Sequence, residues 1–367
     1  KMQDSFVWLV SISMCFFFNY FFDRTLLFDC AYDARSVRKS KIYKAFYTNR
    51  FILFSGLLAA VCISIIYIIY KVFPFGDSTV MRMDLYHQYG PLFAELYDRV
   101  VNHQSFIYSW TSGGGSSFLG NYFNYLSSLL SVIIFFFDKE NISFAISFLV
   151  SVKCILSACT FTYYLKKSQL KHSYMTAVFG VFYAFSAYFL AYYWNVMWLD
   201  GMILLPLIAL GIENIINKGN GKLYILSLVL LFVSSYYMGF MCCIFAVLYF
   251  IAYYLISSNV NDVISPEKTF EKKYSLKALY NNKFINRGIK FAVFSIISAM
   301  LCAVTLIPTF IILRSCSATS DNFPSTFESY FNIFDFITSH LAGLETTIRS
   351  SGDDVLPNVY SGMLAAI

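Results

Sequence analysis

Residues 51–73 read FILFSGLLAAVCISIIYIIYKVF, an apolar run whose only charged residue, Lys71, lies close to its end. A helix needs about 20 such residues to cross the hydrocarbon core of a bilayer. The whole chain has the same character, because 58% of its residues are hydrophobic and only 13% are charged. A typical water-soluble domain carries about 25% charged residues. The sequence therefore predicts an all-α, polytopic transmembrane helical bundle.

Other apolar runs are also long enough to span a membrane. The first of them, residues 5–22, is predicted to span, with a helix on the membrane surface as the alternative. The run at 122–137 differs, because its short apolar core suits an interfacial or re-entrant segment better than a crossing. The predicted spans are residues 5–22, 51–73, 142–165, 174–193, 200–216, 222–236, 239–257 and 291–313, with another beginning near residue 359.

The distribution of Lys and Arg predicts the orientation, because these residues accumulate on the cytoplasmic side. If residues 122–137 do not cross, 19 of the 27 Lys and Arg fall in linkers on one side. Those linkers are 23–50, 166–173, 217–221 with Lys222, and 258–290. Residues 74–141 then form a long first extracytoplasmic loop, which we expect to carry short juxtamembrane helices. Residues 194–199 and 314–358 lie outside as well.

Two regions follow from this reading. We interpret residues 1–50 as an N-terminal extension with one candidate transmembrane helix and a basic cytoplasmic linker. Residues 51–367 form a transmembrane domain that we expect to be truncated at its C-terminus. The net charge of +6 is modest and gives no indication of a nucleic-acid partner. The nine cysteines lie mostly in apolar runs without metal-binding spacing, which indicates buried thiols.

Polar groups at the apolar boundary are the informative residues of a membrane protein, because each is costly unless something satisfies it. The segment after the first core span, residues 75–91, gathers seven of them. They can bind a cation through two carboxylates, or let one carboxylate accept a proton from a hydroxyl. The alternative is a solvated loop in which the second Asp caps a helix. The residues are Asp77, Arg82, Asp84, Tyr86, His87, Gln88 and Tyr89.

The glycine-rich segment 109–122 contains Trp110, which closely precedes its first glycine. It lacks the lysine of a phosphate-binding loop and the preceding strand of a dinucleotide fold. A turn that holds the loop against the membrane and a pocket lining are equal alternatives. Trp194 and Trp198 border two spans, where aromatic residues are expected as interface anchors whatever the function.

Two charged residues remain. Asp200 opens an apolar helix, where it is either the helix cap or a pocket group facing Asp77 and Asp84. Lys153 lies near mid-depth of the span 142–165. A buried ammonium needs an anion, which we expect to be Asp84, Asp200 or the phosphate of a lipid ligand. Snorkelling to the surface is the alternative.

These residues carry a family resemblance. Five or more separated motifs, in order from about residue 50 to the end, resemble the bacterial YfhO family. Its members are much longer, so the resemblance covers roughly their N-terminal half, and residues 1–50 depart from the pattern. The motifs are residues 74–77 leading to 84–89, 108–110 before the glycine cluster, 194–200 leading to 204–207, 235–241 and 356–362.

The resemblance implies a GT-C-like glycosyltransferase fold in a multi-pass protein of the bacterial cell membrane. Such enzymes take a sugar from a polyprenyl-phosphate carrier on the outer face. The implied acceptor is an extracytoplasmic glycopolymer, such as lipoteichoic or wall teichoic acid. The acidic residue after the first core span is the catalytic base or metal ligand, which on this sequence is Asp84 first and Asp77 second.

The implied site also binds substrate. Lys153 or Arg82 would hold the donor phosphate, with or without a divalent cation, Mg²⁺ or Mn²⁺, on Asp77 and Asp84. The predicted substrate-binding residues are Arg82, Tyr86, His87, Gln88, Tyr89, Trp110, Lys153, Trp194, Trp198 and Asp200. The aromatic members, Tyr86, Tyr89, Trp110, Trp194 and Trp198, would stack on sugar rings. A transporter or lipid flippase is the alternative, although mid-membrane polar groups would then be expected. A non-catalytic scaffold is the third hypothesis.

Overall fold

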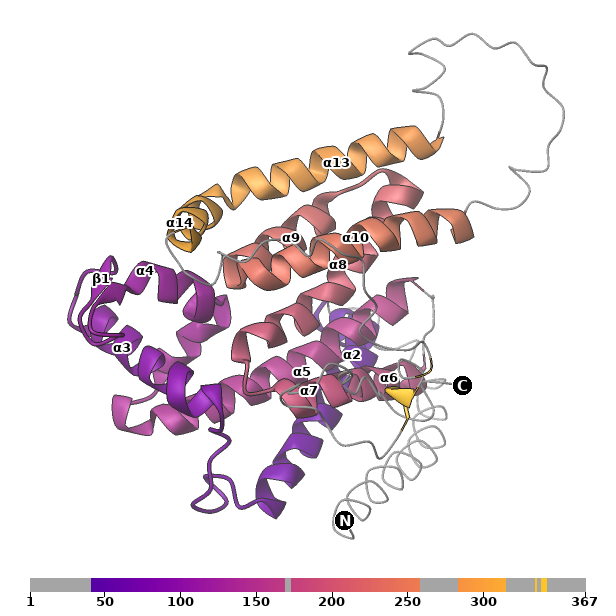
Figure 1. Ribbon diagram of the computed structural model, residues 1–367. Coiled ribbons are helices and arrows are strands. Elements are labelled where there is room, and N and C mark those ends of the chain that lie inside the picture. The colour runs from indigo at the N-terminus through magenta and orange to yellow at the C-terminus, as the bar shows by residue number, and fades with distance from the viewer. Residues whose placement is uncertain (1–40, 169–172, 258–282, 315–333, 335–337, 342–367) are drawn as a thin grey trace, which may run out of the picture. The chain divides into compact units, whose positions relative to one another are not determined.

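The computed structural model describes residues 41–168, 173–257, 283–314, 334 and 338–341 (Figure 1). Predictions for the run at 5–22, for nearly all of the loop 314–358 and for the run beginning near 359 concern residues outside this part. The chain divides into two compact units. The first comprises residues 1–80, 150–192 and 330–367, and the second comprises residues 81–149 and 193–329.

Six helices in the described part are long and apolar enough to cross a membrane. This confirms the prediction of an all-α polytopic helical bundle. The region at 122–137 is part of two helices, Phe118–Leu126 and Leu129–Phe136, that meet at a bend of 99°. Such a pair is either a broken span or a re-entrant loop. That residues 122–137 do not cross the membrane therefore stays a prediction. The six spans are Tyr47–Ile69, Lys139–Ser168, Tyr174–Tyr192, Val196–Lys218, Tyr236–Ser257 and Lys283–Leu301.

Three predicted boundaries were wrong. Helix α2 (Lys41–Ile69) begins inside the predicted linker 23–50. The predicted span 222–236 is helix α9 (Lys222–Ser234), only 13 residues long. The predicted span 291–313 is two helices, α13 (Lys283–Leu301) and α14 (Ala303–Leu313), separated at Cys302. Hydropathy alone does not predict this break, because both helices are apolar and the residue between them is not charged.

In the first unit, α2 packs against α6 (Tyr174–Ala184), and the second part of α5 (Ile142–Ser168) is bonded to both. Small residues allow this close approach, as in other membrane helix pairs. Thr162 on α5 donates to the Ser55 hydroxyl on α2 at 2.9 Å. A Cβ at Gly180 on α6 would lie 2.0 Å from the Thr162 hydroxyl and 2.7 Å from the Ala158 carbonyl. A short helix, α7 (Ala187–Tyr192), completes this span.

In the second unit, α8 (Leu199–Lys218) lies against α9 and α10 (Tyr236–Ser257), and α9 also contacts α13 (Figure 1). Gly211 on α8 lies directly against the backbone of Tyr224, which explains why these two helices approach so closely. Polar pairs between the helices are satisfied. The Tyr224 and Ser295 hydroxyls are 2.8 Å apart, and Tyr249 donates to the buried Glu213 at 2.7 Å.

The polar part of the second unit consists of short elements, as expected for the loop 74–141. They are the π-helix η1 (Leu85–Tyr89), α3 (Gly90–Val101), the hairpin strands β1 (Tyr108–Ser109) and β2 (Ser116–Ser117), α4 (Phe118–Asn121), the π-helix η2 (Tyr122–Leu126), and the 3-10 helices η3 (Leu129–Phe136) and η4 (Lys139–Asn141). Arg99 ties α3 to the hairpin. It donates to Glu95 and to the Tyr108 carbonyl, and its guanidinium lies 4.2 Å from the ring centroid of Phe118.

Two glycine substitutions test the packing of the first unit. Gly180→Ala should lower the free energy of unfolding by about 1–3 kcal/mol, because the new methyl group overlaps neighbouring side-chain and backbone atoms. Gly288→Ala on α13 is the matched control, because nothing lies within 4 Å of its Cβ position. Thermal unfolding of the purified chain in detergent measures both. Equal midpoints for the two variants would contradict the packing described for α5 and α6.

Candidate functional site

Three segments of the second unit, residues 82–89, 122–128 and 193–200, meet around the side chain of Tyr89. Its ring is completely buried. Its hydroxyl donates to Oδ1 of Asn195 over 3.4 Å. The ring of Tyr125 lies edge-on to it, with centroids 5.5 Å apart. Polar residues that are far apart in the sequence therefore form one cluster.

The electrostatics of Tyr89 show which charges surround it. Burial raises the pKa of Tyr89 far above its ordinary value, and Tyr125, Asp84 and Asp200 raise that pKa further, while a hydrogen bond with the Met197 backbone opposes the shift. Both carboxylates therefore act on the same phenol. A protonated phenol is a hydrogen-bond donor, and Tyr89 uses its proton in the bond to Asn195.

Asp84 directly precedes η1, which is the position of a helix cap, yet its side chain makes no capping hydrogen bond. The alternative in which this residue simply caps a helix through Tyr97 therefore lacks its defining interaction. The residue is half-buried. A partly desolvated carboxylate beside a buried phenol is well placed to accept a proton.

Asp200 is the second residue of α8 and is 4% exposed. It is not the N-cap, because Trp198 occupies that position. The Ser128 hydroxyl donates to its Oδ1 at 2.9 Å. The positive end of the α8 dipole also favours a carboxylate in the first turn. Asp200 is therefore an internal group of the cluster. Its charge acts on the Tyr89 phenol, as the charge of Asp84 does.

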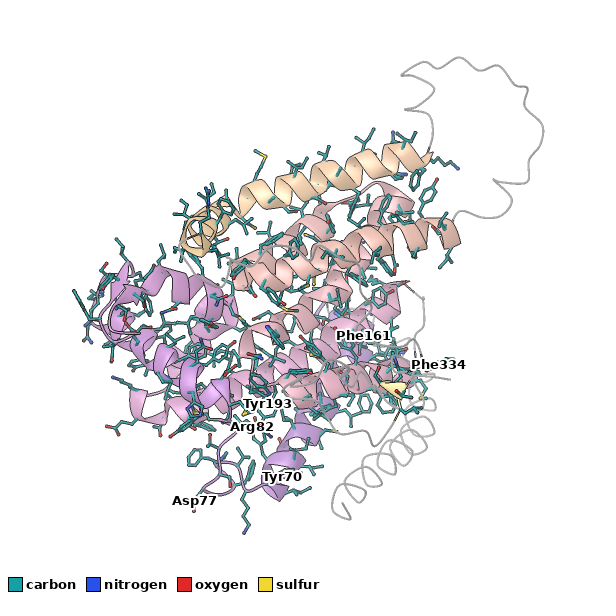
Figure 2. All side chains as sticks on the ribbon, viewed as in Figure 1. Tyr70, Asp77, Arg82, Phe161, Tyr193 and Phe334 are labelled. Atoms are coloured by element: carbon teal, nitrogen blue, oxygen red, sulfur yellow. The ribbon has the colours of Figure 1, made fainter. Side chains whose placement is uncertain are left out.

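Arg82 and Tyr193 lie side by side at the edge of the cluster (Figure 2). Burial raises the pKa of Tyr193, and the charge and hydrogen bond of Arg82 oppose this rise. Arg82 itself is exposed. It provides a solvent-accessible guanidinium, the group best suited to bind a phosphate.

The predicted stacking residues differ in their exposure. Trp110 is 79% exposed, at the hairpin, and the Tyr86 ring is exposed beside His87. Tyr89 and Trp194 are buried, so they line the inside of the cluster and present no open ring face here. Trp198 and Gln88 are half-buried, and His87 is exposed.

The glycine-rich segment forms the hairpin loop between β1 and β2. Gly113, Gly114 and Gly115 all have positive φ angles, which side chains rarely adopt. A Cβ at Gly115 would lie 2.1 Å from the hydroxyl of Tyr108. The glycines therefore form a tight turn, and a role of the segment in lining a pocket stays a prediction.

Asp77 and Lys153 belong to the first unit. Asp77 is exposed in the loop after α2 and points outward from it (Figure 2). Lys153 is completely buried in α5, as a residue in the middle of a span should be. Its predicted pairing with Asp84, Asp200 or a lipid phosphate stays a prediction, and so does a common role of Asp77 and Asp84.

A divalent cation would need several acidic or imidazole ligands. Within the described residues, no group of three or more His, Cys, Asp and Glu side chains could hold one. A cation on Asp77 and Asp84 therefore stays a prediction, and the chemistry proposed below contains no step through a metal.

Sequence reasoning missed Tyr125, Ser128 and Asn195. None is charged, and each lies among apolar or small residues. Their importance comes from the contacts that bring η2 and the start of η3 next to residues 195–200. The only signal in the sequence is that Asn195 lies between two Trp residues and close to Asp200.

The sequence profile of a family described as "Bacterial membrane protein YfhO" matches residues 55–367, which is well over half of the chain. The chain therefore belongs to this family, which agrees with a multi-pass membrane protein of bacteria. The comparisons with curated proteins and with solved structures returned no match.

Two serine substitutions test the cluster. Ser128→Ala should lower the free energy of unfolding by about 1.5–3 kcal/mol, because it removes a donor from the buried Asp200 carboxylate. Ser131→Ala is the matched control, because the buried Ser131 hydroxyl has no hydrogen-bond partner among the described residues. Denaturant unfolding measures both variants. If Ser131→Ala lowers the free energy of unfolding as much as Ser128→Ala does, the hydrogen bond from Ser128 does not stabilise the buried Asp200 carboxylate.

Proposed function

We propose that this YfhO family protein is a membrane glycosyltransferase that moves a sugar from a polyprenyl-phosphate carrier to an extracytoplasmic glycopolymer, such as lipoteichoic or wall teichoic acid. The observation that carries the proposal is the half-buried Asp84 carboxylate, which makes no capping bond and lies within electrostatic reach of buried Tyr89. Family membership and the GT-C-like motifs around this residue support it.

The proposed reaction is a single inverting displacement. Asp84 removes the proton from an acceptor hydroxyl while that oxygen forms a bond to the anomeric carbon of the sugar. The bond from the anomeric carbon to the carrier phosphate breaks, and polyprenyl phosphate leaves with the electron pair. Because a phosphate is a stable anion at neutral pH, its departure needs no general acid.

Tyr89 is proposed as a positioning residue. Its hydrogen bond to Asn195 anchors η1 to the start of the segment that leads into α8. The charges of Asp84 and Asp200 both act on this phenol, which links the position of η1 to that of α8. This arrangement keeps the Asp84 carboxylate in place while the acceptor binds.

The substrate groups have suitable partners nearby. The exposed Arg82 guanidinium is the proposed contact for the carrier phosphate. The exposed rings of Tyr86 and Trp110 are proposed to cover the apolar face of a sugar. The isoprenoid tail would lie along the lipid-facing helices.

Asp84→Asn should reduce sugar transfer by roughly 10²-fold or more, the usual contribution of a general base. Asp84→Glu should retain partial activity. The assay uses membranes with the full chain and a labelled polyprenyl-phosphate sugar, with product detected on the acceptor polymer. Asp138→Asn is the matched control, because Asp138 also directly precedes a short helix of the same unit and makes no side-chain capping bond, but it is exposed.

Full transfer by Asp84→Asn at normal expression would contradict the assignment of the base. Uptake or flipping of the carrier without any sugar transfer by the wild type would favour a transporter. Transfer that persists in EDTA would contradict the predicted divalent cation on Asp77 and Asp84.

A further inference from the structure

Four cationic side chains from three helices converge at one end of the second unit. Lys218 is the last residue of α8, Lys222 is the first residue of α9, and Arg287 and Lys290 lie in the first two turns of α13. We call these four residues the basic cluster. They come together although 65 residues or more of sequence separate Arg287 and Lys290 from Lys218 and Lys222.

Gly219 allows this convergence. It ends α8 in the left-handed conformation, with φ of 68°. A Cβ at this position would lie 2.2 Å from Nη1 of Arg287 and 2.9 Å from Nζ of Lys290. The two cations of α13 therefore lie directly over the C-terminal end of α8, and a side chain at residue 219 would displace them.

Among the described residues of the unit, no observed salt bridge compensates the positive charge of the cluster. The C-terminal end of a helix provides only about half a negative charge. In the described part of the chain, the two observed salt bridges, Arg99–Glu95 and Lys139–Asp98, involve none of the four residues. Glu213, the nearest acidic residue of α8 in sequence, is buried and accepts a hydrogen bond from Tyr249.

The sequence of the linker between α10 and α13 supplies no excess of acid. Residues 258–282 contain three acidic residues and four lysines. The cluster therefore keeps a net positive charge that an anion from outside the chain can balance.

The surface that continues from the cluster is apolar. The face of α13 that carries Phe291 packs on Phe250 of α10, with ring centroids 4.8 Å apart. Another face, with residues at helical spacing of four and three, is exposed to the surroundings. Its members are Ile289, Val293, Ile296 and Met300. Cations at the end of a helix and an apolar stripe along it match the two parts of a phospholipid.

We propose that the basic cluster binds the headgroup phosphate of an anionic phospholipid, whose acyl chains lie along the exposed stripe of α13. The Arg287 guanidinium can bind two phosphate oxygens at once, and the lysines add charge around it. Basic pockets between membrane helices are known to select anionic headgroups. This site is independent of the proposed glycosyltransferase activity.

Native mass spectrometry of the full chain with added phosphatidylglycerol or phosphatidylcholine tests the proposal. The wild type should bind phosphatidylglycerol more tightly, and the double variant Arg287→Gln/Lys290→Gln should lose roughly 10- to 30-fold of that affinity. The double variant Lys71→Gln/Lys167→Gln is the matched control. It removes the same charge from two exposed lysines of the first unit and should retain the preference.

A conservative exchange, Arg287→Lys/Lys290→Arg, keeps both charges and should retain most of the binding even if the glutamine variant folds poorly. Competition with inorganic phosphate distinguishes a lipid site from a site for a soluble anion. Displacement of the lipid by equimolar phosphate would overturn the proposal. Equal binding of both lipids by the wild type would also overturn it. So would an equal loss of affinity for phosphatidylglycerol in the two double glutamine variants.

Discussion

The buried carboxylate of Asp200 is the constraint on which the polar cluster of the second unit depends. A carboxylate that is 4% exposed costs several kcal/mol unless hydrogen bonds and dipoles compensate for the lost water. The first turn of α8 and the Ser128 hydroxyl provide this compensation. Because Ser128 lies between η2 and η3, the same bond fixes the 99° bend against the start of α8. Tyr125 of η2 then packs on Tyr89, which places η1 and Asp84.

The helical spans could be predicted because burial in lipid imposes a long apolar run on the sequence. The breaks within these spans could not be predicted. The break at Cys302 and the early start of α13 at Lys283 leave the hydropathy almost unchanged. They depend on packing between α13 and neighbouring helices, such as the contact of Phe284 with Phe250. The length of a span can be predicted from the hydropathy of one segment, whereas a break in a helix depends on its contacts with a second segment.

The same distinction applies to the candidate site. Asp84 and Asp200 were found from the sequence because charge next to an apolar run is conspicuous. Tyr89 was predicted to stack on a sugar, but it is a buried hydrogen-bond donor. Ser128 and Asn195 are polar residues of ordinary type, and only the fold shows that they hold Asp200 and Tyr89. Sequence therefore identified the charged members of the cluster, and structure identified the groups that position them.

The central claim is that the Asp84 segment faces the outside of the cell, where a lipid-linked sugar and an extracytoplasmic acceptor can meet. Labelling of intact cells with a membrane-impermeant maleimide tests it most directly, with the wild type giving the background of the native cysteines. Cysteine introduced by Tyr86→Cys, an exposed position two residues from Asp84, should react before permeabilisation. Cysteine introduced by Lys218→Cys, at the opposite end of α8 from Asp200, should react only afterwards. Labelling in the reverse order would contradict the claim, because Asp84 would then face the cytoplasm.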